Sequence, residues 1–568
     1  MNSPLPASGG TLDLLLVTVL SAAALTGLAL TLRQLEWSLH ALQQDDYSNR
    51  RFARWLGGSQ DRLFQLRAAL IYLTAAVAHL SLGIVLRLGA GGWGPYVAPA
   101  VASVVAIVSV VRGPLRAPRK KPLVFTGRAI RLLAASVALA AILFVAGFLV
   151  LSRLVERVSH VPAAYAPGLG VLVMAFVSIH AAPFVAMAAN LCLAPVQGSI
   201  NLMYRVRARR KLQRLAPMVV GITGSYGKTS TKYFAEALME SRFRVLKTRA
   251  SFNTILGICR AVNEELGPEH EVLIVEMGAY RRGEIRDMAR LTRPHIGVLT
   301  AIGPQHLERF GSLEKIERAK FELLEALPAD GIAVINNDDP RVRRLSGGLH
   351  LEGVRRYGIE PSDVELDLAA ESISHGPDGL RFTLVERGGA RVAVKTRLIG
   401  LHNVSNILAA ATVARAAGVS LREIALAIGR LAPVPHRLET HTGADGVTII
   451  DDAYNSNPVG AFNALDAMAA FSTGRKILVT PGMVELGAEQ DAWNEKLGEK
   501  AADVCDFVIL VGKSRTAAIR RGLEGRRFAA DRLISVRSLN DGLGALKGIV
   551  RVGDVVLFEN DLPDLYEE

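Results

Sequence analysis

A glycine-rich segment that ends in Lys228, Thr229 and Ser230 is the part of the sequence best suited to chemistry. It begins at Gly221 as GITGSYGKTS and follows an apolar run, 218–220, of the kind that forms a buried strand. A tight turn between a strand and a helix points backbone N–H groups and the positive end of the helix dipole at one place, which suits a phosphate. In such a turn Lys228 reaches the outer phosphates and the Thr229 hydroxyl ligates magnesium.

The glycine spacing of this segment differs from that of the common nucleotide-binding loop. The common loop has a glycine five residues before its last one, where this sequence has Ile222. A glycine-rich turn before an ordinary helix is the alternative interpretation, but the Lys-Thr-Ser ending favours phosphate binding. The predicted nucleotide contacts are Gly224, Ser225, Gly227, Lys228, Thr229 and Ser230.

Three residues further along the chain could act together with this loop. Glu276 ends an apolar run, 270–278, and an acid at the carboxyl end of a parallel strand lies beside the ligand crevice. A plain surface acid is the alternative for Glu276. His306 follows in a loop, and Lys320 falls on the apolar face of a predicted helix. Because desolvating an ammonium is costly, Lys320 is either directed out to solvent, chemically modified, or paired within a site.

From residue 216 onward, short apolar strands alternate with helices. This pattern is typical of a parallel sheet covered by helices on both faces. The region 340–400 is predicted to be rich in strands, and a proline-rich joint at 431–437 separates two α/β domains, 216–433 and 434–568. The clearest strands are expected at 270–278, 296–300, 447–450, 476–480, 507–511 and 555–558.

The charge of the chain is concentrated in its first third. Residues 1–215 hold 22 Lys and Arg against 6 Asp and Glu, whereas the remainder holds 44 against 47. The net charge of +13 therefore describes the N-terminal region and argues against a nucleic-acid partner for the rest. The three cysteines are widely scattered, which excludes a disulfide framework or a paired metal motif.

Five apolar runs in the first 200 residues are long enough to cross a bilayer, which takes about 20 residues per helix. They lie near 12–32, 67–88, 94–111, 130–152 and 168–193. Basic residues gather in the first-to-second and third-to-fourth loops, so the N-terminus is predicted to face outward and everything after residue 200 to be cytoplasmic. The sequence thus predicts a transmembrane domain, 1–200, in the inner membrane, followed by a basic juxtamembrane linker, 201–215.

Polar residues inside these runs, His79, His180 and Asn190, have two interpretations. Intramembrane polar groups are often functional, but bonding to a neighbouring helix is as common an explanation. Both interpretations stay open for these three residues.

Five motifs in order resemble the Mur ligases, the ATP-dependent amide-forming enzymes of cell-wall peptide synthesis. The resemblance covers about 216–490, and the branch that adds D-alanyl-D-alanine to the muramoyl tripeptide is the most similar, on VEMGA at 275–279 and PGMVELG at 481–487. The motifs are GITGSYGKTS at 221–230, VEMG at 275–278, His306 followed by Ala319-Lys320, HNVSN at 402–406, and DDAYN at 451–455.

The resemblance implies a fold, a mechanism and a set of site residues. A P-loop-type central ATPase domain and a Rossmann-like C-terminal domain are expected, with catalysis through an acyl phosphate formed from ATP. Lys228 is expected to hold the outer phosphates, Thr229 and Glu276 to hold one magnesium, and His306 with a carbamylated Lys320 to serve a second. The other implied contacts are Asn403 with adenine, Arg437 with the γ-phosphate, Asp452 or Asp451 with ribose, and Asn253 with the carboxylate substrate.

Three departures from the family shape the expected function. One is Pro481-Gly-Met483, which stands where the D-alanyl-D-alanine branch usually has Gly-Asp-Met. Membrane helices take the place of the soluble domain that binds the UDP-sugar, and the chain ends in FENDLPD at 558–564 rather than in a basic Lys-Gly-Ser-Arg motif. We therefore expect a membrane-anchored ligase that joins a carboxylate to an amine, one of them lipid-linked, membrane-bound or polymeric, with possible cell-envelope protein partners. The alternatives are a component of an ATP-driven exporter and a non-catalytic nucleotide-binding scaffold.

Overall fold

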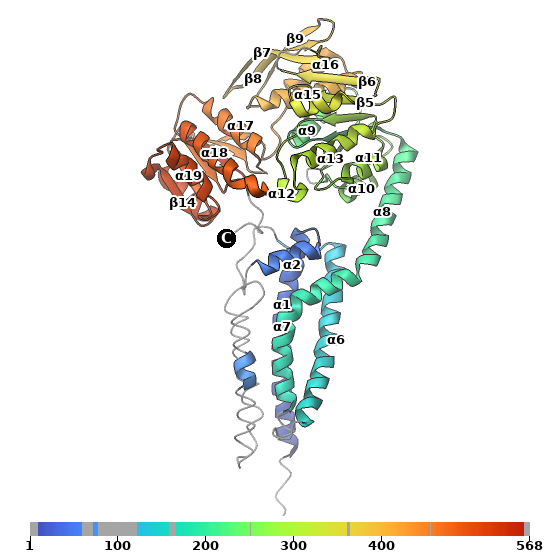
Figure 1. Cartoon of the computed structure of the whole chain (residues 1–568), viewed down its shortest axis with the longest axis vertical. Coiled ribbons are helices and arrows are strands. Elements are labelled where there is room, and N and C mark those ends of the chain that lie inside the picture. Colours follow the sequence, from blue (N-terminus) through green and yellow to red (C-terminus); the bar gives the residue numbers. More distant parts are fainter. Residues whose placement is uncertain are drawn as a thin grey trace, which may run out of the picture. The chain divides into compact units, whose positions relative to one another are not determined.

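The computed structural model describes residues 9–58, 72–77, 122–157, 166–249, 252–359, 364–454 and 456–561. The chain separates after Ile200 into two compact units. Figure 1 labels the elements of both units along the chain.

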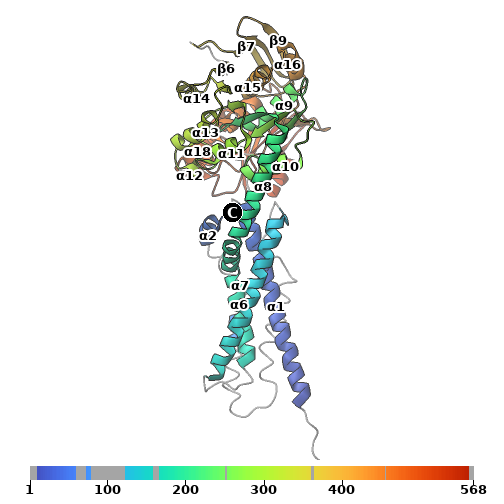
Figure 2. The ribbon, with the colours of Figure 1, turned by 90° about the vertical axis from the view of Figure 1, so that its right-hand side faces the viewer.

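Helices make up the described part of the first unit. The long apolar ones are α1 (Gly9–Gln44), α6 (Gly127–Arg157) and α7 (Ala166–Cys192), and α2 (Asn49–Gly57) is short and rich in arginine. Helix α8 (Ala194–Leu215) continues into the second unit. Both α1 and α6 pack along α7, as Figure 2 shows. By length and composition α6 and α7 could each cross a membrane.

Three of the five expected apolar helices are confirmed as helices. The runs 12–32, 130–152 and 168–193 lie in α1, α6 and α7, although α7 ends at Cys192. The runs 67–88 and 94–111 lie outside the described residues, apart from 72–77, which are helical.

Asn190 on α7 has a structural partner within this unit. Its Nδ2 donates to Tyr47 O (2.9 Å) and to Asn49 Oδ1 (2.7 Å), and Asn49 Nδ2 donates to Met187 O (2.9 Å). These bonds fasten the turn between α1 and α2 to α7. Of the two interpretations of Asn190, the geometry favours bonding to a neighbouring element. His180 Nδ1 lies 2.8 Å from Phe176 O on its own helix, and His79 lies outside the described residues.

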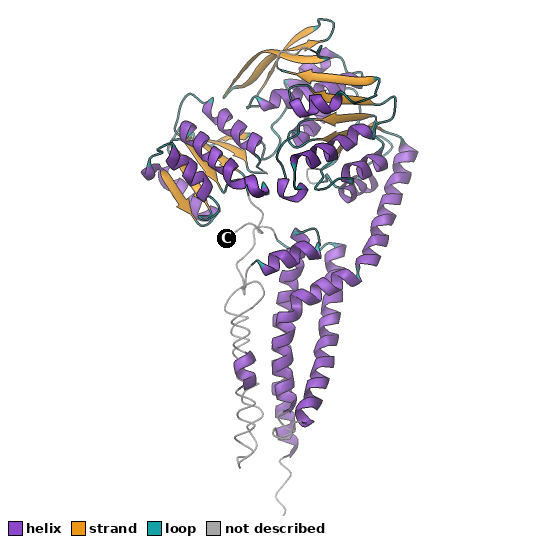
Figure 3. Ribbon diagram, viewed as in Figure 1, coloured by secondary structure: helices purple, strands orange, loops and turns teal. Residues whose placement is uncertain are grey.

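The second unit contains two sheets with helices packed on both faces (Figure 3). The first sheet contains β1 (Met218–Thr223), β2 (Val245–Lys247), β3 (Val272–Glu276), β4 (Ile296–Leu299), β5 (Ile332–Asn336), β6 (Gly353–Gly358), β7 (Leu368–Gly376), β8 (Gly379–Glu386) and β9 (Arg391–Thr396). Its helices are α9 (Lys228–Met239), α10 (Ile255–Glu264), α11 (Glu284–Thr292), α12 (Leu307–Phe310), α13 (Leu313–Glu325), α14 (Pro340–Ser346), α15 (His402–Ala416) and α16 (Leu421–Ile428).

The second sheet lies in the C-terminal part of the chain. Its strands are β10 (Glu439–Thr442), β11 (Thr448–Asp452), β12 (Lys476–Thr480), β13 (Phe507–Val511), β14 (Leu533–Val536) and β15 (Val555–Glu559). The helices around it are α17 (Pro458–Ala469), α18 (Gln490–Val504), α19 (Ala517–Gly525) and α20 (Leu539–Ile549), with 3-10 turns at Gly487–Glu489 and Ala530–Arg532.

Both sheets are mainly parallel, as the alternation of strands and helices predicts. The first has the order β2-β3-β1-β4-β5-β6-β7-β8-β9, and only its β7-β8-β9 end is antiparallel. The second has the order β10-β11-β15-β12-β13-β14, with β10 antiparallel to β11. All of the clearest strands expected from the sequence are present, within a few residues of the predicted ends.

Strand β1 lies between two apolar layers because successive side chains of a strand point to opposite faces. Val220 and Ile222 pack into the core that includes α9 and α15, whereas Val219 packs into the core that includes α10, α11 and α13. This burial on both faces explains why β1 reads as a continuous apolar run. Its carboxyl end, and therefore the loop that follows, is fixed by both cores.

Only part of the 340–400 region forms strands. Its first residues form helix α14, which begins at Pro340. Asp339 caps this helix, because its Oδ1 accepts from Arg341 N (2.9 Å) and Val342 N (3.1 Å). An Asp cap followed by proline is a helix-start signal that overrides the β character of the region.

Two glycines are required in the turn that joins β1 to α9. Gly224 and Gly227 have φ values of 149° and 76°, which L side chains rarely adopt. A Cβ would lie 2.0 Å from Thr300 Oγ1 at Gly224 and 2.3 Å from Asn406 Oδ1 at Gly227. The turn is therefore closely surrounded and intolerant of side chains.

We expect Gly227→Ala to lower the free energy of unfolding by about 1–3 kcal/mol, because it adds both backbone strain and a clash with Asn406. Chemical denaturation of the full chain measures the loss. Gly376→Ala is the matched control. Gly376 ends β7, in the sheet that contains β1, its φ lies outside the left-handed region, and open space surrounds the place of its Cβ. The effect of this substitution on the free energy of unfolding should therefore stay within about 0.5 kcal/mol. Equal losses in the two variants would contradict this account of the turn.

Candidate active site

The loop from Gly224 to Gly227 is held by hydrogen bonds to the segment that follows β4. Ser225 N donates to Ala301 O (2.7 Å), and Gly303 N donates to Ser225 Oγ (3.0 Å). Lys228 Nζ donates to Ser225 O (2.9 Å), so its ammonium lies against the loop. Burial lowers the Lys228 pKa to about 8, with the charge of Arg437 adding to the shift and that of Glu276 opposing it. Ser230 is buried in the first turn of α9.

Glu276 lies directly beside this loop. Strands β1 and β3 pair in parallel with Ile222 opposite Glu276, so the carboxylate emerges at the edge of the sheet from which the loop leaves. Its Oε1 accepts from Thr229 Oγ1 (3.2 Å), and its Oε2 forms an ion pair with Lys232 Nζ (2.9 Å). Glu276 is 2% exposed and Lys232 is fully buried. The surface-acid alternative for Glu276 is wrong.

Lys320 is buried on α13 at 3% exposure, so the interpretation that it is directed out to solvent is wrong. Burial holds its pKa well below the usual value, and the charge of Lys228 adds to this shift. Three carboxylates oppose the shift. Glu276 is paired with Lys232, and Glu284 and Glu322 accept from backbone N–H groups around the start of α11. Within the described parts of the chain, no hydrogen bond or ion pair satisfies the Lys320 ammonium. This environment favours the neutral amine.

His306 contacts the C-terminal part of the chain through Glu485. Its Nδ1 bonds to Glu485 Oε2, while Arg309 donates to Glu485 Oε1 (2.8 Å). Burial works to raise the Glu485 pKa, but the bonds and charges of His306 and Arg309 outweigh it and lower that pKa to about 2. Burial lowers the His306 pKa. A neutral imidazole that donates from Nδ1 to the Glu485 anion leaves Nε2 as an acceptor.

Asn253 lies against the residues that follow Glu276. Its backbone carbonyl accepts from Gly278 N (2.8 Å), and its amide group lies 3.0 Å from where a Cβ of Gly278 would be. Thr254 then caps α10. Asn253, the residue expected near the carboxylate substrate, is therefore bonded to Gly278, which follows Glu276 by two residues in the chain. Asn253 thus lies at the same edge of the sheet as Glu276.

Asn403 occupies the first turn of α15 and is buried. Its Nδ2 donates to Ile399 O (2.8 Å), and its Oδ1 accepts from Asn406 Nδ2 (3.2 Å). Asn406 in turn faces Gly227. The asparagine pair therefore connects the expected adenine contact to the phosphate loop.

Arg437 and Asp452 come from the joint and from β11. The Arg437 guanidinium lies 4.6 Å from the centroid of the Tyr454 ring, and its two neighbours in the chain, His436 and Leu438, have φ values of 58° and 46°. Asp452 Oδ1 accepts from Leu438 N (3.2 Å). Burial raises the Asp452 pKa to about 6, against the opposing charge of Arg437. The residues on both sides of Arg437 thus have strained backbones, and the backbone N–H of each is held by a hydrogen bond to a carboxylate.

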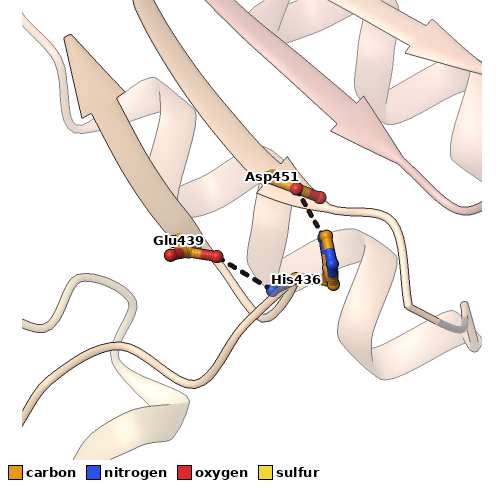
Figure 4. Close-up of side chains that lie close together, drawn as sticks. All are labelled: His436, Glu439 and Asp451. Atoms are coloured by element: carbon orange, nitrogen blue, oxygen red, sulfur yellow. Dashed lines mark hydrogen bonds and ion pairs between the residues drawn. The ribbon is translucent and has the colours of Figure 1, made fainter.

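Asp451, the alternative ribose contact, has different partners. Figure 4 shows Asp451 and Glu439 on paired strands with His436 between them. His436 Nδ1 bonds to Asp451 Oδ2 (2.7 Å), and Glu439 Oε2 accepts from His436 N (3.1 Å). The two carboxylates are directly opposite in the register, where like charges repel, and both bond to His436, Asp451 to its ring and Glu439 to its backbone N–H. This group fastens the joint, whereas Asp452 accepts from the backbone N–H of Leu438.

The structure brings most of the predicted site residues to one sheet edge. Ser225, Lys228, Thr229 and Glu276 are linked by hydrogen bonds or lie on one loop, and Lys320 is close enough for the charges of Lys228 and Glu276 to shift its pKa. Lys232 and Glu485 belong to the same assembly, but the sequence assigned neither a role, although Glu485 lies in the PGMVELG motif at 481–487. Lys232 could have been found, because it lies three residues after Thr229 on the same helix face.

The chain matches two protein-family models, the Mur ligase middle domain at residues 222–414 and the Mur ligase glutamate ligase domain at residues 436–559. UDP-N-acetylmuramoyl-tripeptide–D-alanyl-D-alanine ligase of Escherichia coli is 34% identical over 319 residues, covering 56% of this chain and 69% of that enzyme. Its Bacillus subtilis counterpart is 30% identical over 355 residues, covering 62% and 75%.

Solved structures agree with these matches. MurF from Acinetobacter baumannii superposes with a TM-score of 0.58 at 26% identity, covering 64% of this chain and 78% of that chain. MurF ligase from Thermotoga maritima in complex with ADP gives a TM-score of 0.57 at 27% identity, covering 64% and 80%. The chain belongs to the Mur ligase family and is an ATP-dependent acid–amino acid ligase rather than an exporter component or a scaffold.

Proposed function

We propose that this ligase works at the membrane and joins the carboxylate of a cell-wall precursor to an amine, with one of the two substrates lipid-linked or membrane-bound. The observation that carries the ligase chemistry is the buried Lys320 amine, which forms no hydrogen bond or ion pair among the described residues and lies close enough to Lys228 and Glu276 for their charges to act on its pKa. The relatives named above act on a UDP-muramoyl tripeptide and D-alanyl-D-alanine, which indicates the chemical class of the substrates.

The residues present fit ATP and magnesium. The loop has no side-chain atoms at Gly224 and Gly227, where a Cβ would collide with its surroundings, so its backbone can approach phosphates closely. Thr229 and Glu276 offer hydroxyl and carboxylate oxygens, the ligands that magnesium prefers. Magnesium, when bound, would neutralise charge on the phosphoryl oxygens. Asn403 is the proposed adenine contact and Asp452 the proposed ribose contact.

We propose that Lys320 is carbamylated. Its neutral amine adds to the carbon of carbon dioxide and loses a proton, which converts a buried cation into an anion with two oxygens. A carbamate next to His306 would supply, together with the imidazole Nε2, a second set of metal ligands. The bond from His306 Nδ1 to Glu485 supports this role, since a metal-binding histidine commonly donates its other N–H to a carboxylate.

The cations of the site then stabilise the charge that builds up during the reaction. A substrate carboxylate oxygen, held near Asn253, displaces ADP from the terminal phosphorus and becomes an acyl phosphate. The amine, after losing a proton, displaces phosphate from the acyl carbon and leaves an amide. Lys228 and Arg437 are placed to stabilise the phosphoryl oxygens in both steps, which is electrostatic catalysis.

The first unit supports a membrane location. On α6 large apolar side chains are exposed, among them Ile142 at 64% and Val150 at 68%. An exposed apolar face on a helix of 31 residues is expected in contact with lipid. The basic loops of the first unit favour an orientation that puts the ligase domains in the cytoplasm, where ATP is present.

Replacing Lys320 with Ala is expected to lower ATP-dependent product formation by about 100-fold or more, because the site loses an anion at the reacting phosphate. Acetate or formate should restore part of the activity by entering the vacated space, and wild-type activity should fall when bicarbonate is removed. Lys315→Ala, on an exposed position of the same helix, is the control and should keep wild-type activity. Wild-type activity in the Lys320 variant would exclude the carbamate.

Mass spectrometry of reaction products tests the substrate class. The full-length protein is incubated with ATP, magnesium and a panel of amino acids and dipeptides, in one reaction with host membrane lipid extract and in a second with soluble UDP-muramoyl tripeptide. We expect a lipid-linked product whose mass increases by the amine minus one water, together with ADP, and no such product with Lys228→Ala. If only soluble UDP-muramoyl tripeptide is converted, the membrane part of the proposal is wrong and the ligase part stands.

A further inference from the structure

Both oxygens of the expected metal-binding carboxylate, Glu276, have a partner. Lys232 Nζ lies 2.9 Å from Glu276 Oε2, with side-chain exposures of 0% and 3%. Thr229 Oγ1 lies 3.2 Å from the other oxygen, Oε1. The two proposed magnesium ligands are therefore bonded to each other on one side, and an ammonium covers the carboxylate on the other.

Lys232 contacts the Glu276 carboxylate and has no exposed surface through which to act on a substrate. It is fully buried, so it has no surface with which to contact a nucleotide or a substrate. It lies on α9 one turn after Lys228 and Thr229, and its charge is compensated by Glu276. An apolar side chain of similar length would fill the same space, so packing alone does not account for an ammonium here.

The pair has an electrostatic consequence for metal binding. Charges interact strongly in a buried site, and a divalent cation that approaches Glu276 meets a carboxylate already neutralised, with a positive charge next to it. Free magnesium is therefore expected to bind weakly to the resting site. A triphosphate adds several negative charges on the Thr229 side, where Oε1 is bonded only to a hydroxyl that can itself become a ligand.

We propose that Lys232 is a positioning residue that holds Glu276 Oε2, leaves its Oε1 toward Thr229, and makes metal loading depend on the nucleotide. This inference rests on the proposed role of Glu276 as a magnesium ligand. Lys232 thus suppresses binding of the metal alone and favours its entry as the metal–nucleotide complex.

The test measures the affinity of free Mn2+ for the purified full-length protein without nucleotide, by the electron paramagnetic resonance signal of unbound Mn2+. Lys232→Met and Lys232→Gln should each bind Mn2+ about tenfold or more tightly than wild type, because the competing charge is gone. Lys232→Gln keeps an N–H donor for Glu276 and so secures a folded protein. Both variants should also show a melting temperature that rises with Mn2+, whereas that of the wild type should not.

Two controls separate the possible failures. Lys247→Met removes the lysine of a second Lys–Glu pair, in which Lys247 on β2 contacts Glu236 on α9. This variant should leave the affinity for Mn2+ unchanged. Unchanged or weaker Mn2+ binding in both Lys232 variants would overturn the inference. Glu276→Gln should lose affinity for Mn2+ with ATP, and if it binds that complex like wild type, the proposed role of Glu276 itself is wrong.

Discussion

The electrostatics of the active site depend on one constraint, the sharing of a single carboxylate by three lysines. Lys228, Lys232 and Lys320 are partly or fully buried near Glu276. Glu276 forms an ion pair with Lys232, and its charge acts on the pKa of Lys228 and of Lys320. Among the described residues, only Lys232 forms an ion pair with it. When Lys228 is also charged, the two ammonium groups outnumber this one carboxylate, and an anion such as a phosphate compensates the remaining positive charge.

The fold supplies this arrangement by placing strand ends side by side. Strand β1 is buried on both faces, so the loop at its carboxyl end cannot move without disturbing two cores. Its neighbours β3 and β4 bring Glu276 and the Thr300–Gly303 segment to the same edge. The joint at Arg437 adds a further cation from the second sheet, held between two residues with strained backbones. The chemistry thus depends on a rigid edge that several distant segments build.

Much of this could be predicted from the sequence, because its signals are local. The apolar run of β1, the Lys-Thr-Ser ending and the position of Lys320 on an apolar helix face each need only a few neighbouring residues. The sequence assigned no role to Lys232, or to Glu485 within the PGMVELG motif, because their partners are 44 and 179 residues away in the chain. Helix α14 was missed because its cap, Asp339 followed by Pro340, lies at the start of a region otherwise rich in strands. Partners of that kind are set by topology rather than by spacing.

Carbon-13 nuclear magnetic resonance of the full-length protein, equilibrated with labelled bicarbonate, shows whether the buried amine of Lys320 takes up carbon dioxide and becomes an anion. We expect a carbamate carbonyl signal in the wild type that is missing from Lys320→Ala. If the wild type gives no signal at saturating bicarbonate, or the variant gives an equal one, Lys320 is not carbamylated.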